Sequence, residues 1–170
     1  MRTYTHAILS HVVAGRFSDG RYAAWASAGA ALPDLPALAG SAWLALRGRR
    51  FSRRSFYGEV CGSRRFALPD AALHSAPALA VPALALAAYG LRGRPSPRGT
   101  WFLLGWAGHV ASDVLTHGSD ARPPLWPLSR WRFESPVSYR ERNRHGVPFT
   151  AAEHAVLLAL GYAALRRRGR

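Results

Sequence analysis

The chain has 170 residues, of which 49% are hydrophobic and 19% charged, and its formal net charge is +14 at pH 7. This length suits a single domain with a substantial core. All 23 basic residues are arginine, a bias typical of a GC-rich genome, so the charge by itself indicates little beyond attraction to phosphates, anionic headgroups or nucleic acid. The single cysteine, Cys61, excludes an internal disulfide and argues against a cysteine-based zinc site.

Apolar residues recur with helical spacing in five segments, and almost nothing alternates with the period of two that a half-buried strand needs. We therefore predict an all-α bundle that forms one domain over residues 1–170. The predicted helices cover residues 4–14, 22–46, 68–91, 100–117 and 149–166. The first is interrupted by His6 and His11, and no clear A-x-A-like cleavage site follows it, so we do not expect a signal peptide.

Prolines predict breaks in two of these helices. The stretch LPDLP interrupts 22–46, because proline lacks a backbone donor and disfavours helix at the residue before it. Pro77 and Pro82 predict that 68–91 is kinked or begins late.

The last helix and the connections complete the predicted chain. Thr150 with Glu153 three residues later predicts a capping box at the start of the last helix. An arginine-rich connection is expected at 47–66, a short turn at 92–99 and a long irregular connection at 118–148.

Two segments approach the length that crosses a membrane, about 20 apolar residues. These are 71–91 and 149–165, whereas 100–117 qualifies only with its histidines and aspartate included. Arginines crowd both ends of 71–91, so neither side is preferred, and the mean hydropathy of −0.07 is low for a polytopic protein. Two alternatives stay open: a bundle embedded in or tightly attached to the bacterial cytoplasmic membrane, with lipids as partners, and a soluble cytoplasmic bundle with a very apolar core.

The stretch GHVASDVLTHG places His109, Asp113 and His117 at intervals of four residues. On a helix this spacing forms one stripe. Burying a lone carboxylate costs several kcal/mol unless something compensates it. A divalent metal does so, because imidazole and carboxylate are ordinary zinc ligands. The alternative is an Asp–His pair that only hydrogen-bonds or caps the end of the helix.

Further polar groups lie in other apolar segments. Asp34 alone fits a cap of the turn that begins at Leu35, and His74 alone fits a core histidine with satisfied hydrogen bonds. Together with His6, these groups come from separate segments that a helical bundle can direct to one centre. The combination predicts a metal site.

Three other features are less specific. His145 lies in a polar string and is expected to be solvated, and His154 fits either a further ligand or an exposed position. The block 123–136 is rich in tryptophan and arginine, which suits a membrane interface, a phosphate-bearing substrate or a rigid packed loop.

Five short motifs follow one another along the chain. They are Thr5–His6, Leu32–Asp34, His74–Ser75, GHVASDVLTHG and Leu125–Ser129. In this order, over residues 1–130, they resemble the YdjM-like membrane-bound metal-dependent hydrolases, which are similar in pattern to the zinc-dependent phospholipase C group. The resemblance implies an α-helical, membrane-associated protein with hydrolytic activity and with metal ligands at His6, Asp34, His74, His109 and Asp113. The Thr-His-Gly sequence that ends the fourth motif, with His117 in its middle, resembles the zinc-dependent phospholipase C group.

We therefore expect a metal-dependent hydrolase, with zinc as the preferred metal, that acts on a phosphoester or lipid-like substrate through a metal-activated water. His117 joins the expected ligands, Asp34 or Asp113 is expected to accept the proton of the water, and Arg122, Arg130 and Arg132 are expected to bind the phosphate. The alternative is a non-catalytic membrane protein with a structural metal site. Nucleic acid is not an expected main partner, because the arginines are scattered and no zinc finger, leucine zipper or aromatic RNA-binding signature occurs.

Overall fold

The computed structural model describes residues 1–168, and its regular secondary structure in that range is all helical, without a strand. This confirms the predicted all-α fold. Its elements are α1 (Thr3–Phe17), α2 (Ala23–Ala31), η1 (Leu32–Asp34), α3 (Leu35–Leu46), α4 (Arg53–Ser55), η2 (Phe56–Cys61), α5 (Arg64–Leu73), α6 (Ala76–Leu91), α7 (Pro97–Thr116), η3 (Arg142–Arg144) and α8 (Gly146–Arg168).

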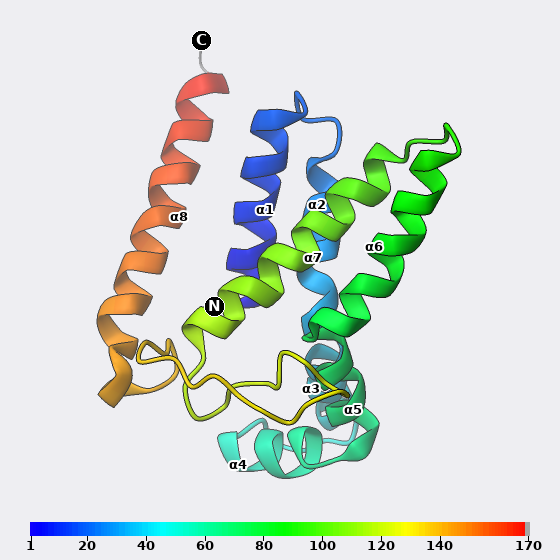
Figure 1. The fold of residues 1–170 in the computed structure, drawn as a ribbon. Helices are drawn as coiled ribbons and strands as arrows, with labels where there is room; N and C mark the ends of the chain where they lie inside the picture. The colour runs from blue at the N-terminus through cyan, green and yellow to red at the C-terminus, as the bar shows by residue number, and fades with distance from the viewer. Residues whose placement is uncertain (169–170) are drawn as a thin grey trace.

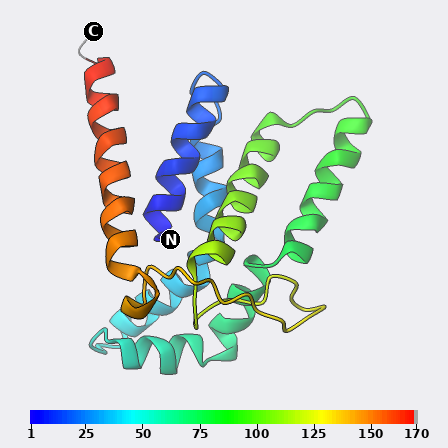
Figure 2. The ribbon, with the colours of Figure 1, turned by 60° about the vertical axis from the view of Figure 1, so that its left-hand side comes forward.

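Five helices run alongside one another, and the remaining elements form a layer across one end of them (Figures 1 and 2). The upright helices are α1, α2, α6, α7 and α8, whereas α3, α4, α5 and the long connection after α7 make up the end layer. The N-terminus lies beside this layer, and α8 stands apart from α6 on the far side of the bundle. The fold therefore brings the start of α1, the end of α2 and the end of α7 to the same level.

The core contact of the bundle is the packing of α2 against α1 and α7. Two glycines make the second of these contacts very close. A Cβ atom on Gly29 would overlap the carbonyl of Phe102, and one on Gly105 would overlap the carbonyl of Ala26. The backbones of α2 and α7 thus touch directly, as small residues allow at helix crossings in membranes.

Both predicted helix breaks occur. The LPDLP stretch divides 22–46 into α2, η1 and α3. The segment 68–91 breaks at His74–Ser75, where α5 and α6 meet at 55°. The hydroxyl of Ser75 accepts a hydrogen bond from the Ala78 amide and so caps α6, which places Pro77 in the favourable first turn. The bend therefore comes before the prolines to which the sequence assigned it.

The start of the last helix differs from the prediction. α8 begins at Gly146 rather than 149, and the capping box is wrong because Thr150 already lies inside the helix. Glu153 instead forms an ion pair with Arg2 and accepts a hydrogen bond from the Arg2 amide. This pairing anchors the first turns of α8 to the start of α1.

Two connections are more structured than predicted. The stretch 47–66 contains α4 and the π-helical turn η2, and the irregular stretch 118–148 contains η3 and the first residues of α8. Ser52 and Ser55 cap the start of α4 reciprocally. The spacing of the two serines indicates this helix start, whereas hydrophobic periodicity does not.

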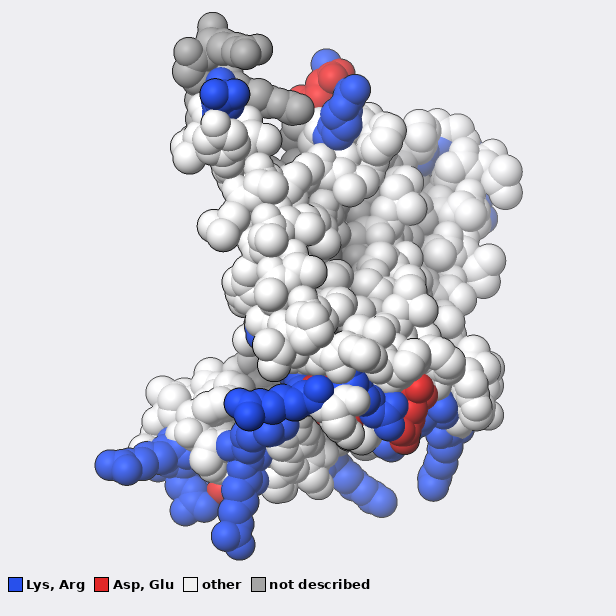
Figure 3. All heavy atoms as spheres, turned by 90° about the vertical axis from the view of Figure 1, so that its left-hand side faces the viewer, with Lys and Arg blue, Asp and Glu red and all other residues white. Residues whose placement is uncertain are grey.

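The face of the molecule that Figure 3 shows has an uncharged band between two charged ends. Exposed arginines lie in the end layer, at Arg47, Arg49, Arg50, Arg53 and Arg54, and in the opposite turns, at Arg16, Arg21, Arg92 and Arg94. Within the described chain, residues 146–166 of α8 are long and apolar enough to cross a membrane and are almost entirely unburied, and the bent pair α5–α6 is a second candidate.

Candidate metal centre

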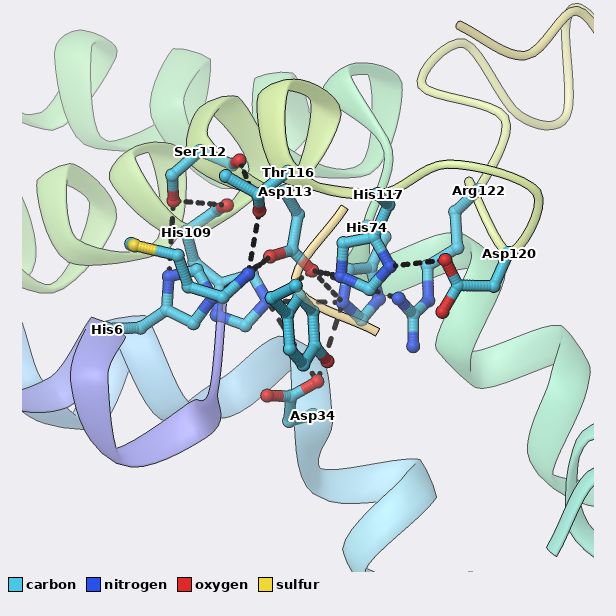
Figure 4. Close-up of polar contacts among 12 residues, drawn as sticks. His6, Asp34, His74, His109, Ser112, Asp113, Thr116, His117, Asp120 and Arg122 are labelled. Carbon is cyan, nitrogen blue, oxygen red and sulfur yellow. Dashed lines mark hydrogen bonds and ion pairs between the residues drawn. The ribbon is translucent and has the colours of Figure 1, made fainter. Parts of the chain in front are cut away.

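The six histidine and aspartate side chains predicted as ligands lie together in one cluster (Figure 4). They come from α1, η1, the α5–α6 break, α7 and the residue after α7. The cluster contains His6, Asp34, His74, His109, Asp113 and His117. Five of these side chains are buried, and only Asp34 is intermediate.

Two histidines, His74 and His109, point their Nε2 atoms at each other. Nδ1 of His109 lies 2.6 Å from the Ala30 carbonyl, and Nδ1 of His74 lies 2.8 Å from the Asp70 carbonyl. A carbonyl only accepts, so each Nδ1 carries the proton and each Nε2 of a neutral ring holds a free lone pair. The two Nε2 atoms are 3.1 Å apart. Two lone pairs cannot hydrogen-bond to each other, whereas a shared cation satisfies both.

Two carboxylates flank this pair of nitrogens. Asp113 Oδ2 lies 3.4 Å from Nε2 of His109 and 3.6 Å from Nε2 of His74. Asp34 Oδ1 lies 3.7 Å from the His74 nitrogen and 4.0 Å from the His109 nitrogen. Asp34 precedes α3 but makes no side-chain capping bond there, and it accepts a hydrogen bond from the Thr3 hydroxyl instead. The capping role considered for Asp34 is therefore wrong.

His6 closes the cluster from the side of α1. Its Nε2 lies 2.9 Å from Asp113 Oδ1, and its ring stacks on that of His109 with centroids 3.9 Å apart. Although close to the carboxylate, this buried nitrogen is not aligned for a hydrogen bond to any partner in the described chain. The Met1 amine also lies 3.0 Å from Asp113 Oδ1. Asp113 is thus the most heavily shared group of the cluster.

The donors fit a divalent metal. His6, His109 and Asp113 form one group of three whose donor atoms all lie within 4.8 Å of one another, and Asp34, His74 and His109 form a second. Imidazole nitrogen and carboxylate oxygen are the donor types that suit zinc. The carbonyls of Ala30 and Asp70 hold the far nitrogens of two rings, which is the usual second set of contacts around metal-binding histidines.

His117 contacts this centre through Asp113. Its Nε2 lies 3.1 Å from Asp113 Oδ2, and its Nδ1 lies 3.1 Å from Asp120 Oδ1. Burial by itself lowers the pKa of His117, but the two carboxylates raise it above the ordinary value. Burial likewise favours neutral Asp120, yet His117 and Arg140 hold the pKa of Asp120 at about 2. The geometry places His117 outside both groups of three and between two acids.

Of the three predicted phosphate-binding arginines, Arg122 lies at the centre. Its guanidinium contacts both Asp70 carboxylate oxygens at 2.6 and 3.1 Å, and its Nη1 lies 3.7 Å from Asp113 Oδ2. Arg132 is exposed but lines a cavity of about 260 Å³ that Arg122 also lines. Arg130 is exposed and takes part in no ion pair found within residues 1–168.

Asp70 is a member of the site that the sequence analysis missed. The tetrapeptide Ala-Leu-Pro-Asp occurs twice, at 31–34 and 67–70. The aspartate of each copy contacts His74. The carboxylate of Asp34 lies near Nε2, and the backbone carbonyl of Asp70 accepts a hydrogen bond from Nδ1. This repetition was the available signal for Asp70.

Asp120 and Arg140 were missed as well, because they lie in the irregular connection, where no periodic pattern singles them out.

The two histidines judged less specific lie outside the cluster. His145 is exposed, as predicted, and has a left-handed backbone conformation. His154 is exposed on α8, where its Nε2 lies 2.9 Å from the Tyr4 hydroxyl.

The sequence matches the family described as YdjM inner membrane protein over residues 1–168. No curated protein and no solved structure gave a match. An inner-membrane location agrees with the uncharged band of Figure 3 and with the apolar, unburied α8, and it favours the membrane alternative over a soluble bundle. On its match over nearly the whole length, the chain belongs to the YdjM inner membrane protein family.

Proposed function

We propose that the protein is a metal-dependent hydrolase of the inner membrane that cleaves a phosphoester with a metal-activated water. The observation that carries this proposal is the pair of facing Nε2 atoms of His74 and His109, 3.1 Å apart and flanked by two carboxylates. Ligands of a tetrahedral zinc ion are separated by about 3.3 Å, which follows from metal–nitrogen distances near 2.05 Å.

The proposed ligands are the members of the two groups of three: His6, His109 and Asp113, with Asp34 and His74. A divalent metal held there, with zinc the best suited, lowers the pKa of a bound water to about 7 and polarises a phosphoryl oxygen.

Asp34 is the carboxylate best placed to accept a proton. It is less enclosed than Asp113, with 14% of its side chain exposed against 8%. Burial alone raises the pKa of Asp34, but His74, His109 and the Thr3 hydroxyl bring it below the usual value, so the group is ionised at neutral pH. It also lines a cavity of about 550 Å³ in which a substrate phosphate can approach. An ionised carboxylate at the edge of a cavity is a suitable general base.

Arg122 is the residue best placed to stabilise the charge of that phosphate. It lines the same cavity as Asp34. Its bidentate pairing with Asp70 fixes the guanidinium plane and leaves Nη1 on the side of the metal ligands. An arginine held in this way needs little reorganisation when negative charge develops on the substrate.

The test is metal content and hydrolysis measured on the same preparations. Wild-type protein, purified without chelator, is expected to carry about one or more equivalents of zinc or manganese and to hydrolyse bis(p-nitrophenyl) phosphate. A His109→Ala/Asp113→Ala double variant is expected to lose both. The matched control is His154→Ala, which removes an exposed histidine outside the cluster. Equal metal content and equal hydrolysis in the double variant would refute the proposal.

A structural role for the metal is a second candidate function, because the ligands come from separate elements of the fold. They come from four separate parts of the fold, so a metal bound there also ties α1, η1, the α5–α6 break and α7 together. A purely structural site predicts that chelation lowers the thermal stability while no phosphoester is hydrolysed at any metal loading. Zinc that is bound stoichiometrically, without turnover of any phosphoester offered, would support this alternative.

A further inference from the structure

The candidate metal centre has a second approach, on the side away from the cavity that Asp34 and Arg122 line. A groove of about 270 Å³ runs between α1 and α7 and ends at His6, His109 and Ser112. Its walls are apolar and include Leu9, Val13, Trp101 and Leu104. Val13 and Leu104 are 52% and 53% exposed.

This groove lies at the depth of the hydrocarbon. It is lined by residues 6–13 of α1 and 101–112 of α7. These stretches lie between the exposed Arg16 and Arg94 at one end of the bundle and the arginines of the end layer at the other. Because the protein resides in the inner membrane, an exposed apolar groove in this band faces lipid chains rather than water.

The cavity on the other side is partly apolar but also carries basic groups. Its lining, around a volume of about 550 Å³, includes Arg122, Tyr139 and Arg140 beside apolar residues such as Leu38 and Phe56. Burial raises the pKa of the Tyr139 hydroxyl to about 12, which keeps that group a hydrogen-bond donor. The two spaces meet at one cluster of donors, since Asp34 borders the cavity, His109 borders the groove, and Oδ1 of Asp34 lies 4.0 Å from Nε2 of His109. A molecule that reaches both must be anionic at one end and apolar at the other.

We propose that the centre is reached laterally from the bilayer, and that the groove between α1 and α7 holds a hydrocarbon chain of a membrane phosphoester whose phosphate lies among the arginines. This inference rests on the proposed function and adds the class of substrate: a lipid drawn from the membrane rather than a water-soluble phosphoester. A transmembrane helix, about 10 Å across, covers such a groove but does not enter it.

The structure offers a direct way to fill the groove. Gly108 lines it, and a Cβ atom at this position meets nothing within 4 Å. We therefore expect the ring of Gly108→Phe to occupy the groove while α1 and α7 stay in place. Gly161→Phe on α8 is the matched control, because that glycine is also exposed and open. Val13→Phe, from the opposite wall, provides an independent variant if Gly108→Phe fails to fold.

The experiment measures binding of ethyl phosphate and dodecyl phosphate by calorimetry. The protein is held in an amphipathic polymer and the dodecyl phosphate kept below its micelle-forming concentration. We expect wild-type protein and Gly161→Phe to bind dodecyl phosphate at least about tenfold more tightly than ethyl phosphate, because burial of each methylene is favourable. Gly108→Phe is expected to lose this preference and to bind ethyl phosphate as wild type does.

Three results would overturn the inference. The first is equal binding of the two phosphates by wild type, and the second is a chain preference that Gly108→Phe and Val13→Phe both retain. The third is a wild-type dimer that Gly108→Phe dissociates, since a second copy of the chain would then cover the groove. Hydrolysis of bis(p-nitrophenyl) phosphate, measured in parallel, does not need the groove. If wild-type protein does not hydrolyse this substrate, the result counts against the proposed function. If wild-type protein hydrolyses it but shows no chain preference, the result counts against the lipid route alone.

Discussion

Replacing Gly105 and Gly108 by alanine, one at a time, tests the packing that places the metal centre. The two glycines are three residues apart on α7 but face different surroundings. A Cβ atom at Gly105 overlaps the Ala26 carbonyl and lies 3.0 Å from the Ala30 nitrogen, whereas one at Gly108 meets nothing within 4 Å. Gly105→Ala must therefore push α2 and α7 apart, and Gly108→Ala must not.

The two variants should differ clearly in stability. Overpacking of this kind costs about 1–3 kcal/mol, whereas alanine in place of an open helical glycine gains up to about 1 kcal/mol. The expected difference is thus about 1–4 kcal/mol. In a chain of this size each kcal/mol shifts Tm by about 2–4 °C, so Gly105→Ala should melt at least about 2 °C below Gly108→Ala. Thermal unfolding of detergent-solubilised protein, followed by circular dichroism, measures this.

The same comparison reaches the candidate metal centre. The Ala30 carbonyl, which holds Nδ1 of His109, belongs to the stretch of α2 that Gly105→Ala displaces. We expect less bound metal in Gly105→Ala and unchanged metal in Gly108→Ala, by elemental analysis. If both variants melt together and carry equal metal, the close crossing of α2 and α7 does not position His109, and the reasoning fails.

Three further predictions concern the neighbours of the cluster. When the free metal concentration is about a thousand times its Kd, adding a chelator should lower the free energy of unfolding by about 4 kcal/mol. This corresponds to a drop in Tm of about 8–16 °C, which the His109→Ala/Asp113→Ala variant should not show. Asp70→Asn breaks the half-buried pair with Arg122 and should cost about 2 kcal/mol in denaturant unfolding, yet it should retain metal, because His74 is held by the backbone carbonyl of Asp70. Glu153→Ala removes the partner of Arg2 and should speed amide exchange in the first turns of α8 without changing metal content; unaltered exchange would contradict that anchoring role.

Local pattern was enough to predict the helices and the stripe on α7. His109 and Asp113 lie together because side chains four residues apart on a helix share a face, whatever the rest of the fold does. His117 follows the last residue of α7 in an extended conformation and still reaches Asp113. The break at LPDLP also follows from local geometry, since proline restricts its own backbone and that of the residue before it. The gathering of His6, Asp34 and His74 could be predicted only in outline, from acids and histidines spread over separate apolar segments.

Tertiary packing decided how each of these side chains is used. The Asp34 side chain makes no capping bond because it turns to Thr3 and His74 instead. His117 lies between Asp113 and Asp120 because the connection after α7 brings Asp120 back to it. Asp70, far from the α7 stripe in sequence, enters the site through the bend between α5 and α6. The sequence by itself determined which residues share a helix face, because that depends on a short-range repeat. Only the tertiary structure decided which faces meet, because helix crossings depend on close backbone contacts, such as those at Gly29 and Gly105, that no local period encodes.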